Sequence, residues 1–184
     1  MKIYKITQTQ NKVIAMITGP TGAGKTTLLN QIKNEIPEVT IKDIDDFVSS
    51  TSSYVSPSTQ SQINSFISAN NNIVFAGMLF DVNTNWKRIT VSIGNENLII
   101  PAKYKFMLNV DVEENMKRKM QRTMQEYQTD PASFKEGKPV YQDFVNEQRL
   151  NQEYVQKARQ IGYMETSAPQ IIATIKEEIN NPKY

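Results

Sequence analysis

The chain has 184 residues, 39% of them hydrophobic and 22% charged, which suits one domain with a sizeable core. Its net charge of +2, without a long run of one sign, argues against nucleic acid or a membrane as the main partner. The chain contains no cysteine and no histidine. Disulfides, cysteine-based zinc sites and Ser-His-Asp triads are therefore excluded, and acid–base chemistry must use Asp, Glu, Lys or Tyr.

The first residues, Met1 to Ile6, lack the long apolar stretch of a signal peptide, and no segment is long enough to span a bilayer. We therefore expect a soluble, cytoplasmic protein. Along the chain, apolar runs alternate with helical patterns, which is typical of a parallel α/β sheet. Strands are predicted at residues 13–18, 38–44, 73–78, 104–110 and 163–166. Helices are predicted at residues 25–36, 57–69, 112–127, 140–161 and from about 169 onward. A polar stretch over 49–62 is expected to contain a mobile loop.

This pattern predicts a single three-layer α/β domain over 1–184, with a mostly parallel five-stranded sheet and helices on both faces. One segment does not fit the alternation. Residues 89–93 and 98–100 are apolar or β-branched and flank Gly94 to Asn97, so they are expected to form an extra hairpin over 89–100.

The most specific feature lies directly after the first predicted strand and opens the first predicted helix. It is the octapeptide Gly19-Pro20-Thr21-Gly22-Ala23-Gly24-Lys25-Thr26. It fits Gly-x-x-x-x-Gly-Lys-Ser/Thr in full, and strand, glycine-rich loop and helix form the context that this phosphate-binding motif requires. The following helix places Leu28, Ile32 and Ile36 on one face.

The chemistry of this loop predicts a nucleoside triphosphate site, with ATP as the expected nucleotide. Backbone amides would surround the phosphates at a helix N-terminus, Lys25 would reach the β- and γ-phosphates, and the Thr26 hydroxyl would ligate Mg²⁺. The predicted nucleotide-binding residues of this segment are Gly19, Thr21, Gly22, Ala23, Gly24, Lys25, Thr26 and Thr27.

Acidic residues follow the second predicted strand. Ligands of open α/β sheets bind beyond the carboxyl ends of the strands, so Asp45 is predicted to be the base that takes a proton from an acceptor hydroxyl. Asp46 is predicted to help hold Mg²⁺ through water. The alternative is a pair of solvated acids in a loop.

The third predicted strand ends without the acid expected near Mg²⁺. It continues as Phe75-Ala76-Gly77, and no acid follows until Asp81. Either Asp45, Asp46 or Asp81 compensates, or the protein binds nucleotide and turns it over poorly.

The helix predicted from residue 112 carries two arginines one turn apart, Arg118 and Arg122. Such a pair can clamp a phosphate and stabilise transition-state charge, although a solvated basic face is the alternative. On roughly the opposite face, Met116, Met120 and Met124 form a stripe that is expected to pack into the core.

The segment Glu165-Thr166-Ser167-Ala168 precedes the last helix, where Ser167 and Ala168 are predicted to contact the nucleotide base. It is similar to the base-contacting loop of Ras-like GTPases. The other GTPase motifs, Asp-x-x-Gly and Asn-Lys-x-Asp, are absent from the positions that such a protein requires.

Taken together, these residues resemble the P-loop nucleoside and nucleoside-monophosphate kinases, in particular the uridine kinase and nicotinamide riboside kinase branch. The chain matches the octapeptide, Asp45-Asp46-Phe47 after the second strand, Ala76-Gly77 at the end of the third, and the strand 105–111 followed by spaced arginines. The resemblance implies that residues of about 112–140 form a lid. The family's Glu is Ala76 here, and the family's aromatic residue after Asp-x-Phe is Val48.

Three functions remain open from the sequence. The first is a Mg-ATP-dependent kinase acting on a small-molecule acceptor such as a nucleoside or nucleotide, with Lys25, Asp45, Arg118 and Arg122 as catalytic residues. The second is a regulatory NTPase or GTPase-like switch, in which the loop at 49–62 orders on the γ-phosphate. The third is a degenerate P-loop binding protein that uses the 89–100 hairpin as a contact surface. The oligomeric state is not predicted.

Overall fold

The computed structural model describes residues 12–20, 22–47, 57–77, 81–85, 88–92, 100–108, 111–129 and 144–181. Its main sheet has five strands in the order β2-β3-β1-β6-β7. These strands are β1 (Val13–Thr18), β2 (Thr40–Asp43), β3 (Ile73–Ala76), β6 (Tyr104–Leu108) and β7 (Met164–Thr166). Every neighbouring pair in this sheet is parallel, as the sequence predicts.

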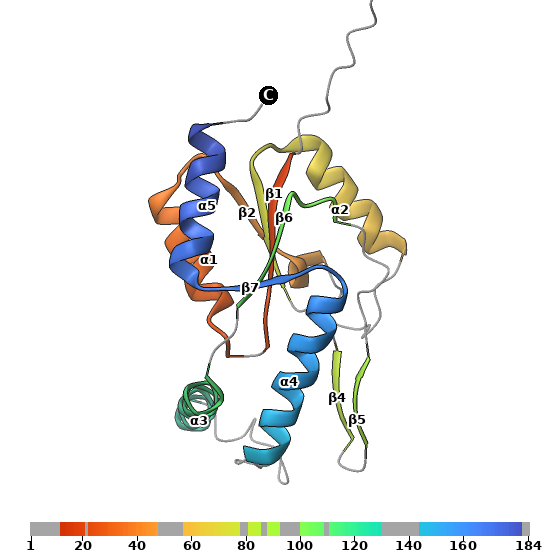
Figure 1. Cartoon of the computed structure of the whole chain (residues 1–184), viewed down its shortest axis with the longest axis vertical. Coiled ribbons are helices and arrows are strands. Elements are labelled where there is room, and N and C mark those ends of the chain that lie inside the picture. Colours follow the sequence, from red (N-terminus) through yellow and green to blue (C-terminus); the bar gives the residue numbers. More distant parts are fainter. Residues whose placement is uncertain are drawn as a thin grey trace, which may run out of the picture.

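Helices cover both faces of this sheet (Figure 1). On one face, α1 (Lys25–Glu35) and α5 (Ala168–Asn180) bury Leu28, Ile32 and Ile171 against the strands. The other face is covered by the short 3-10 helix η1 (Ile44–Phe47), α2 (Pro57–Ala69) and α4 (Phe144–Gln160). All six residues of β1 are buried, because the central strand of a doubly covered sheet has no solvent-facing side.

The apolar periodicity of α1 and α5 is confirmed by their packing. Leu28, Ile32 and Ile36 are all buried, as are Ile171 and Ile175, and Ile179 packs against the same cluster. This spacing of three to four residues forms one apolar stripe on each helix. None of the described helices is both long and apolar enough to cross a membrane.

Only part of the hairpin predicted at 89–100 lies within the described residues. Strand β5 (Arg88–Ser92) contains most of the first expected strand, and it pairs antiparallel with β4 (Asp81–Asn85), which precedes it and was not predicted. Arg88 lies opposite Asn85, so only two residues separate the paired strands along the chain, and a short connection has a small loop-closure cost. Of the second expected strand, only Ile100 lies within the described residues, and it is not in a strand.

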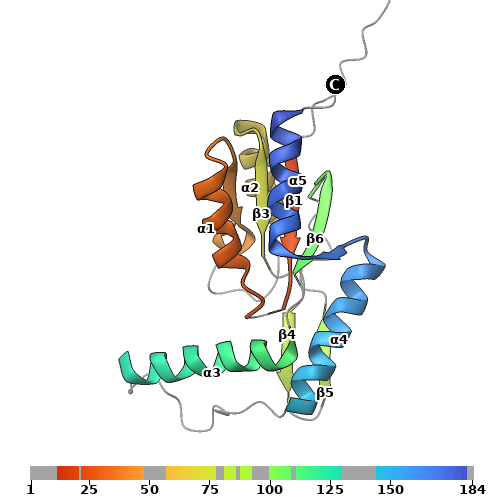
Figure 2. The same ribbon diagram turned by 60° about the vertical axis from the view of Figure 1, so that its left-hand side comes forward.

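Helix α3 (Val112–Thr129) lies beyond the carboxyl ends of the strands and projects from the body of the sheet, with α4 beside it (Figure 2). This position contradicts the prediction that its methionines pack into the core. Met120 and Met124 are 36% and 57% exposed, and Met116 is only partly buried. A helix beyond the sheet edge has only one face against the domain, so no described element covers the opposite face. The rest of the expected lid, residues 130–140, and the polar loop at 49–56 lie outside the described residues.

Candidate active site

The loop between β1 and α1 has the backbone that a phosphate-binding loop requires. Gly22 and Gly24 have positive φ angles of 85° and 91°, in the left-handed region that favours glycine. Gly24 is also the N-cap of α1, and the first turn of this helix carries no acidic side chain. The first-turn amides of α1 therefore face an opening without a carboxylate of their own helix, which favours an anion.

Lys25 lies at the base of this loop. Its Nζ donates hydrogen bonds to the carbonyl oxygens of Gly19, at 2.7 Å, and Pro20, at 3.1 Å. Burial lowers the pKa of Lys25 from its ordinary 10.5 to about 8, although Asp43 and Asp45 act in the opposite direction. The ammonium is thus desolvated and oriented, and a bound phosphate would add a further negative charge that favours it.

A cavity of about 650 Å³ opens in front of this loop. It is lined by Gly22, Ala23, Gly24, Lys25, Thr26, Thr27, Leu28, Gln31, Asp43, Asp45, Gly77, Leu108, Arg118, Lys119, Arg122, Ser167 and Ala168. Most of the residues that the sequence singled out thus meet in one cavity. Gly19 is not part of the lining and contributes only its carbonyl to Lys25, and Thr21 lies outside the described residues.

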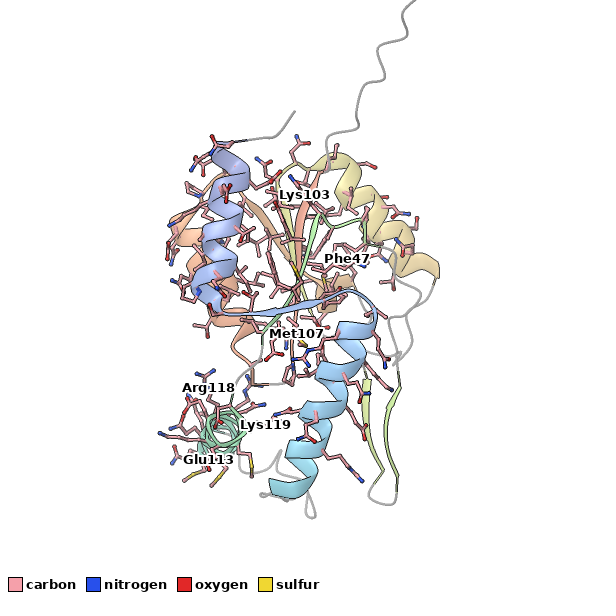
Figure 3. The ribbon with its side chains drawn as sticks, in the orientation of Figure 1. Phe47, Lys103, Met107, Glu113, Arg118 and Lys119 are labelled. Atoms are coloured by element: carbon pink, nitrogen blue, oxygen red, sulfur yellow. The ribbon has the colours of Figure 1, made fainter. Side chains whose placement is uncertain are left out.

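Three positive side chains of α3 form one wall of this cavity: Arg118, Lys119 and Arg122. They share a face of the helix because residues three and four apart lie above one another. Arg118 donates to the Gly22 carbonyl at 3.5 Å and pairs with Glu114 at 2.9 Å. In Figure 3, Arg118 lies on the side of α3 that faces the sheet, and Glu113 lies on the far side.

The carboxylates that line the cavity are Asp43 and Asp45, whereas Asp46 is not part of the lining. Asp46 instead pairs with Lys42, with 2.7 Å between its Oδ2 and the lysine Nζ. Asp46 therefore lies outside the lining of this cavity, and its part in holding Mg²⁺ through water stays a prediction. The physical reason is the 3-10 turn, in which consecutive side chains point about 120° apart, so Asp45 and Asp46 do not face the same opening.

Sequence reasoning missed Asp43, which is the last residue of β2 and lies directly opposite Ala76 of β3. This carboxylate therefore stands beside the position where the expected acid is absent. The spacing Asp43-Ile44-Asp45, with the buried Ile44 between two acids, was the available signal. The backbone amide of Asp45 donates to Asp43 Oδ1 at 3.0 Å, which holds both carboxylates at the same edge of the sheet.

These donors fit a magnesium ion that is shared with a nucleotide. Mg²⁺ prefers oxygen ligands and is commonly bound through one or two carboxylates together with substrate phosphates. Thr26, at the start of α1, and Asp43, at the end of β2, both line the cavity. Among the described residues, no group of three or more acidic side chains forms a metal site by itself, so the nucleotide would have to complete the coordination.

Another missed residue, Asn115, lies behind the loop rather than in the cavity. It is fully buried on α3, and its Oδ1 is so close to Gly22 that a Cβ there would overlap it. Neither side-chain polar atom of Asn115 finds a hydrogen-bond partner within the part of the chain that the structure describes. Its place one turn before Arg118 and Lys119 was the available signal.

The fold and this cavity together define a P-loop nucleotide-binding domain. The sequence matches the KAP family P-loop domain over residues 2–181, so the chain belongs to that family. No curated protein matches the sequence.

The solved structures to which this chain is similar are distant in sequence. TT1252 from Thermus thermophilus has a TM-score of 0.52 at 13% identity, covering 95% of this chain and 99% of its own. A shikimate kinase from Acinetobacter baumannii in complex with shikimate has a TM-score of 0.49 at 14% identity, covering 95% and 96%. A gluconokinase from Sinorhizobium meliloti has a TM-score of 0.39 at 11% identity, covering 83% and 97%. At these identities the likeness concerns the fold alone.

Proposed function

We propose that this protein is a Mg²⁺-dependent phosphotransferase that moves the γ-phosphoryl group of ATP to a small-molecule acceptor, a nucleoside or nucleotide being the first candidate. The whole chain, with its lid over about 112–140, would act as one domain. The observation that supports this most strongly is the composition of the cavity. It joins Lys25 and the loop amides to a cationic wall from α3 and to two carboxylates from the end of β2.

Each part of the cavity has a role in this reaction. The amides between Gly22 and Thr26, with Lys25, would hold the β- and γ-phosphates, and Ser167 and Ala168 would contact the base. Thr26 and Asp43 would hold Mg²⁺, which neutralises phosphate charge when it is bound.

The transfer step itself uses the side chains that face the γ-phosphate. The Asp45 carboxylate takes the proton of the acceptor hydroxyl, whose oxygen forms a bond to the γ-phosphorus. The bond between that phosphorus and the β–γ bridging oxygen breaks, and its electron pair leaves with ADP. Arg118 and Arg122 stabilise the charge on the transferring group, as positioned cations do in phosphoryl transfer.

The test is ADP formation from Mg-ATP, measured against a panel of nucleosides, nucleoside monophosphates and phosphorylatable cofactors. We expect acceptor-dependent ADP that is lost in Lys25→Ala and in Asp45→Asn. Asp46→Asn is the matched control, because this acid pairs with Lys42 outside the cavity. Turnover that survives Asp45→Asn, or that falls equally in Asp46→Asn, would contradict the assignment of Asp45 as the base.

A second function is favoured by two observations: the matching family is an NTPase domain, and β3 ends in Ala76 and Gly77 without an acid. In that case water replaces the acceptor, and the protein is a nucleotide-dependent switch rather than a kinase. ADP formation that is independent of every acceptor would favour it, and a preference for guanine nucleotides would favour the GTPase-like form. Nucleotide binding without turnover would favour the degenerate P-loop reading.

A further inference from the structure

A buried chain of hydroxyl contacts connects α4 to the start of the phosphate loop. The Tyr154 hydroxyl contacts Thr18 Oγ1, and Thr18 Oγ1 donates to the carbonyl oxygen of Gly77 at 3.0 Å. A threonine hydroxyl has a single hydrogen, and Thr18 donates it to Gly77. The Tyr154 hydroxyl is therefore the donor in its contact with Thr18. Thr18 and Tyr154 are 0% and 1% exposed, so solvent water does not compete for these contacts.

The residues joined by these hydroxyl contacts belong to separate parts of the cavity. Thr18 ends β1 and directly precedes Gly19, whose carbonyl receives the Lys25 ammonium. Gly77 follows β3, lines the cavity, and donates its amide to the Ile17 carbonyl at 3.1 Å. A shift of either residue would therefore move a wall of the nucleotide site.

Gly77 transmits such a shift to the acids. A Cβ at this position would lie 2.7 Å from the Cβ of Ile44, so the Gly77 backbone is in close contact with that side chain. Ile44 stands between Asp43 and Asp45 and is fully buried. Because close-packed groups do not move independently, a shift of Gly77 would displace Ile44 and, with it, the carboxylates of Asp43 and Asp45.

The helix that carries Tyr154 also contacts the helix that bears the cationic wall. Tyr154 lies on α4, which packs against α3, the helix that carries Arg118 and Arg122 (Figure 2). Tyr154 also belongs to the buried apolar cluster that contains Met16, Phe75 and Met107. A phenylalanine would keep that apolar packing while removing the hydroxyl contact with Thr18.

We propose that Tyr154 is a positioning residue for phosphoryl transfer. It acts through Thr18, and it holds the phosphate loop, the end of β3 and the arginine helix in the arrangement that the reaction needs. This inference rests on the proposed function. Misplacing reacting groups by about 1 Å can cost about 100-fold in rate, so a small shift of these three parts is enough to be measured.

The test compares Tyr154→Phe with Tyr163→Phe. Both changes remove one buried tyrosine hydroxyl from the same apolar cluster, but the Tyr163 hydroxyl is not part of the contact with Thr18. We expect Tyr154→Phe to lower kcat about 10-fold with a smaller change in KM for ATP, while Tyr163→Phe leaves kcat within about 2-fold. Thermal unfolding of both variants measures the purely structural effect.

Thr18 variants test the same contact from its other side. Thr18→Ser keeps the hydroxyl and is expected to retain turnover, whereas Thr18→Val removes the hydroxyl and is expected to lower it. The double variant Tyr154→Phe with Thr18→Val should be no slower than Thr18→Val alone, because both changes remove one interaction.

Equal kcat in Tyr154→Phe and the wild type would overturn the positioning role, as would equal losses in Tyr154→Phe and Tyr163→Phe. If the wild type shows no turnover with any acceptor or with water, the proposed function fails separately. Calorimetric binding of Mg-ATP then decides the inference. A weaker affinity in Tyr154→Phe than in Tyr163→Phe supports it, and equal affinities overturn it.

Discussion

Replacing Lys25 by methionine should change the stability of the protein little at pH 7, but it should lower the stability at higher pH and weaken nucleotide binding. Folding desolvates the Lys25 ammonium, and this burial lowers its pKa from 10.5 to about 8. Each pKa step corresponds to about 1.4 kcal/mol, so the folded protein at pH 7 carries a penalty of about 3 kcal/mol that methionine does not. Methionine has a similar length and no charge.

The gain is reduced by the hydrogen bonds that the substitution removes. Lys25 Nζ bonds the carbonyl oxygens of Gly19 and Pro20, and each lost bond from this charged donor costs about 1.5 kcal/mol or more. We therefore expect the two effects nearly to cancel at pH 7, so that the free energy of unfolding of Lys25→Met stays within about 1 kcal/mol of the wild type in urea denaturation. Lys33→Met, at an exposed position of the same helix, is the control and should change stability by less than about 0.5 kcal/mol.

The pH dependence of this difference identifies its cause. Between pH 8 and pH 10.5 the unfolded chain keeps the Lys25 proton while the folded chain has lost it, so the wild type gains stability as the pH rises through this range. Lys25→Met lacks this gain. The other titrating groups are common to both proteins, so Lys25→Met should become progressively less stable than the wild type as the pH rises toward 10.

Nucleotide binding should weaken. Loss of a charge-assisted contact to phosphate costs about 1.5–3 kcal/mol, so Lys25→Met should lower Mg-ATP affinity by about 10- to 100-fold in calorimetry. Stability profiles of the variant and the wild type that run parallel between pH 7 and pH 10 would refute the argument that Lys25 is held at a desolvation cost. Unchanged Mg-ATP affinity would refute its role at the phosphates.

Three further predictions follow from the described residues. Gly22→Ala should cost at least about 1 kcal/mol more stability than Gly162→Ala in urea denaturation, because both have positive φ but only the first would overlap Asn115; equal costs would contradict that contact. Asp43→Asn should raise the Mg²⁺ concentration needed for half-maximal turnover about 10-fold or more, and an unchanged magnesium titration would remove Asp43 from the metal site. Ile32→Ala should cost about 2–5 kcal/mol of unfolding free energy, and a cost below about 1 kcal/mol would contradict its burial in the core.

Local patterns were sufficient to predict most of the elements. The strand Val13–Thr18 and the helix Pro57–Ala69 have the predicted bounds, since a buried apolar run and a helical periodicity are properties of neighbouring residues. The phosphate loop was equally local, because its glycines, lysine and threonine occur within eight consecutive positions.

Errors arose where distant partners decide the outcome. The apolar spacing of Met116, Met120 and Met124 predicted a core face, but α3 extends past the sheet, where no described element covers that face. The pairing of β5 with the preceding β4 was also missed.

The sequence by itself determined the phosphate loop, the parallel α/β class and the apolar faces of α1 and α5, since these depend on the conformational preferences and spacing of residues close along the chain. Only the tertiary structure decided which acid enters the cavity. Asp43 stands opposite Ala76 because β2 pairs with β3, and Asp46 turns toward Lys42 because η1 is a 3-10 turn. The contact of Tyr154 with Thr18, between residues 136 positions apart, has the same origin. Such contacts form when packing brings remote segments together, so a pattern among neighbouring residues does not predict them.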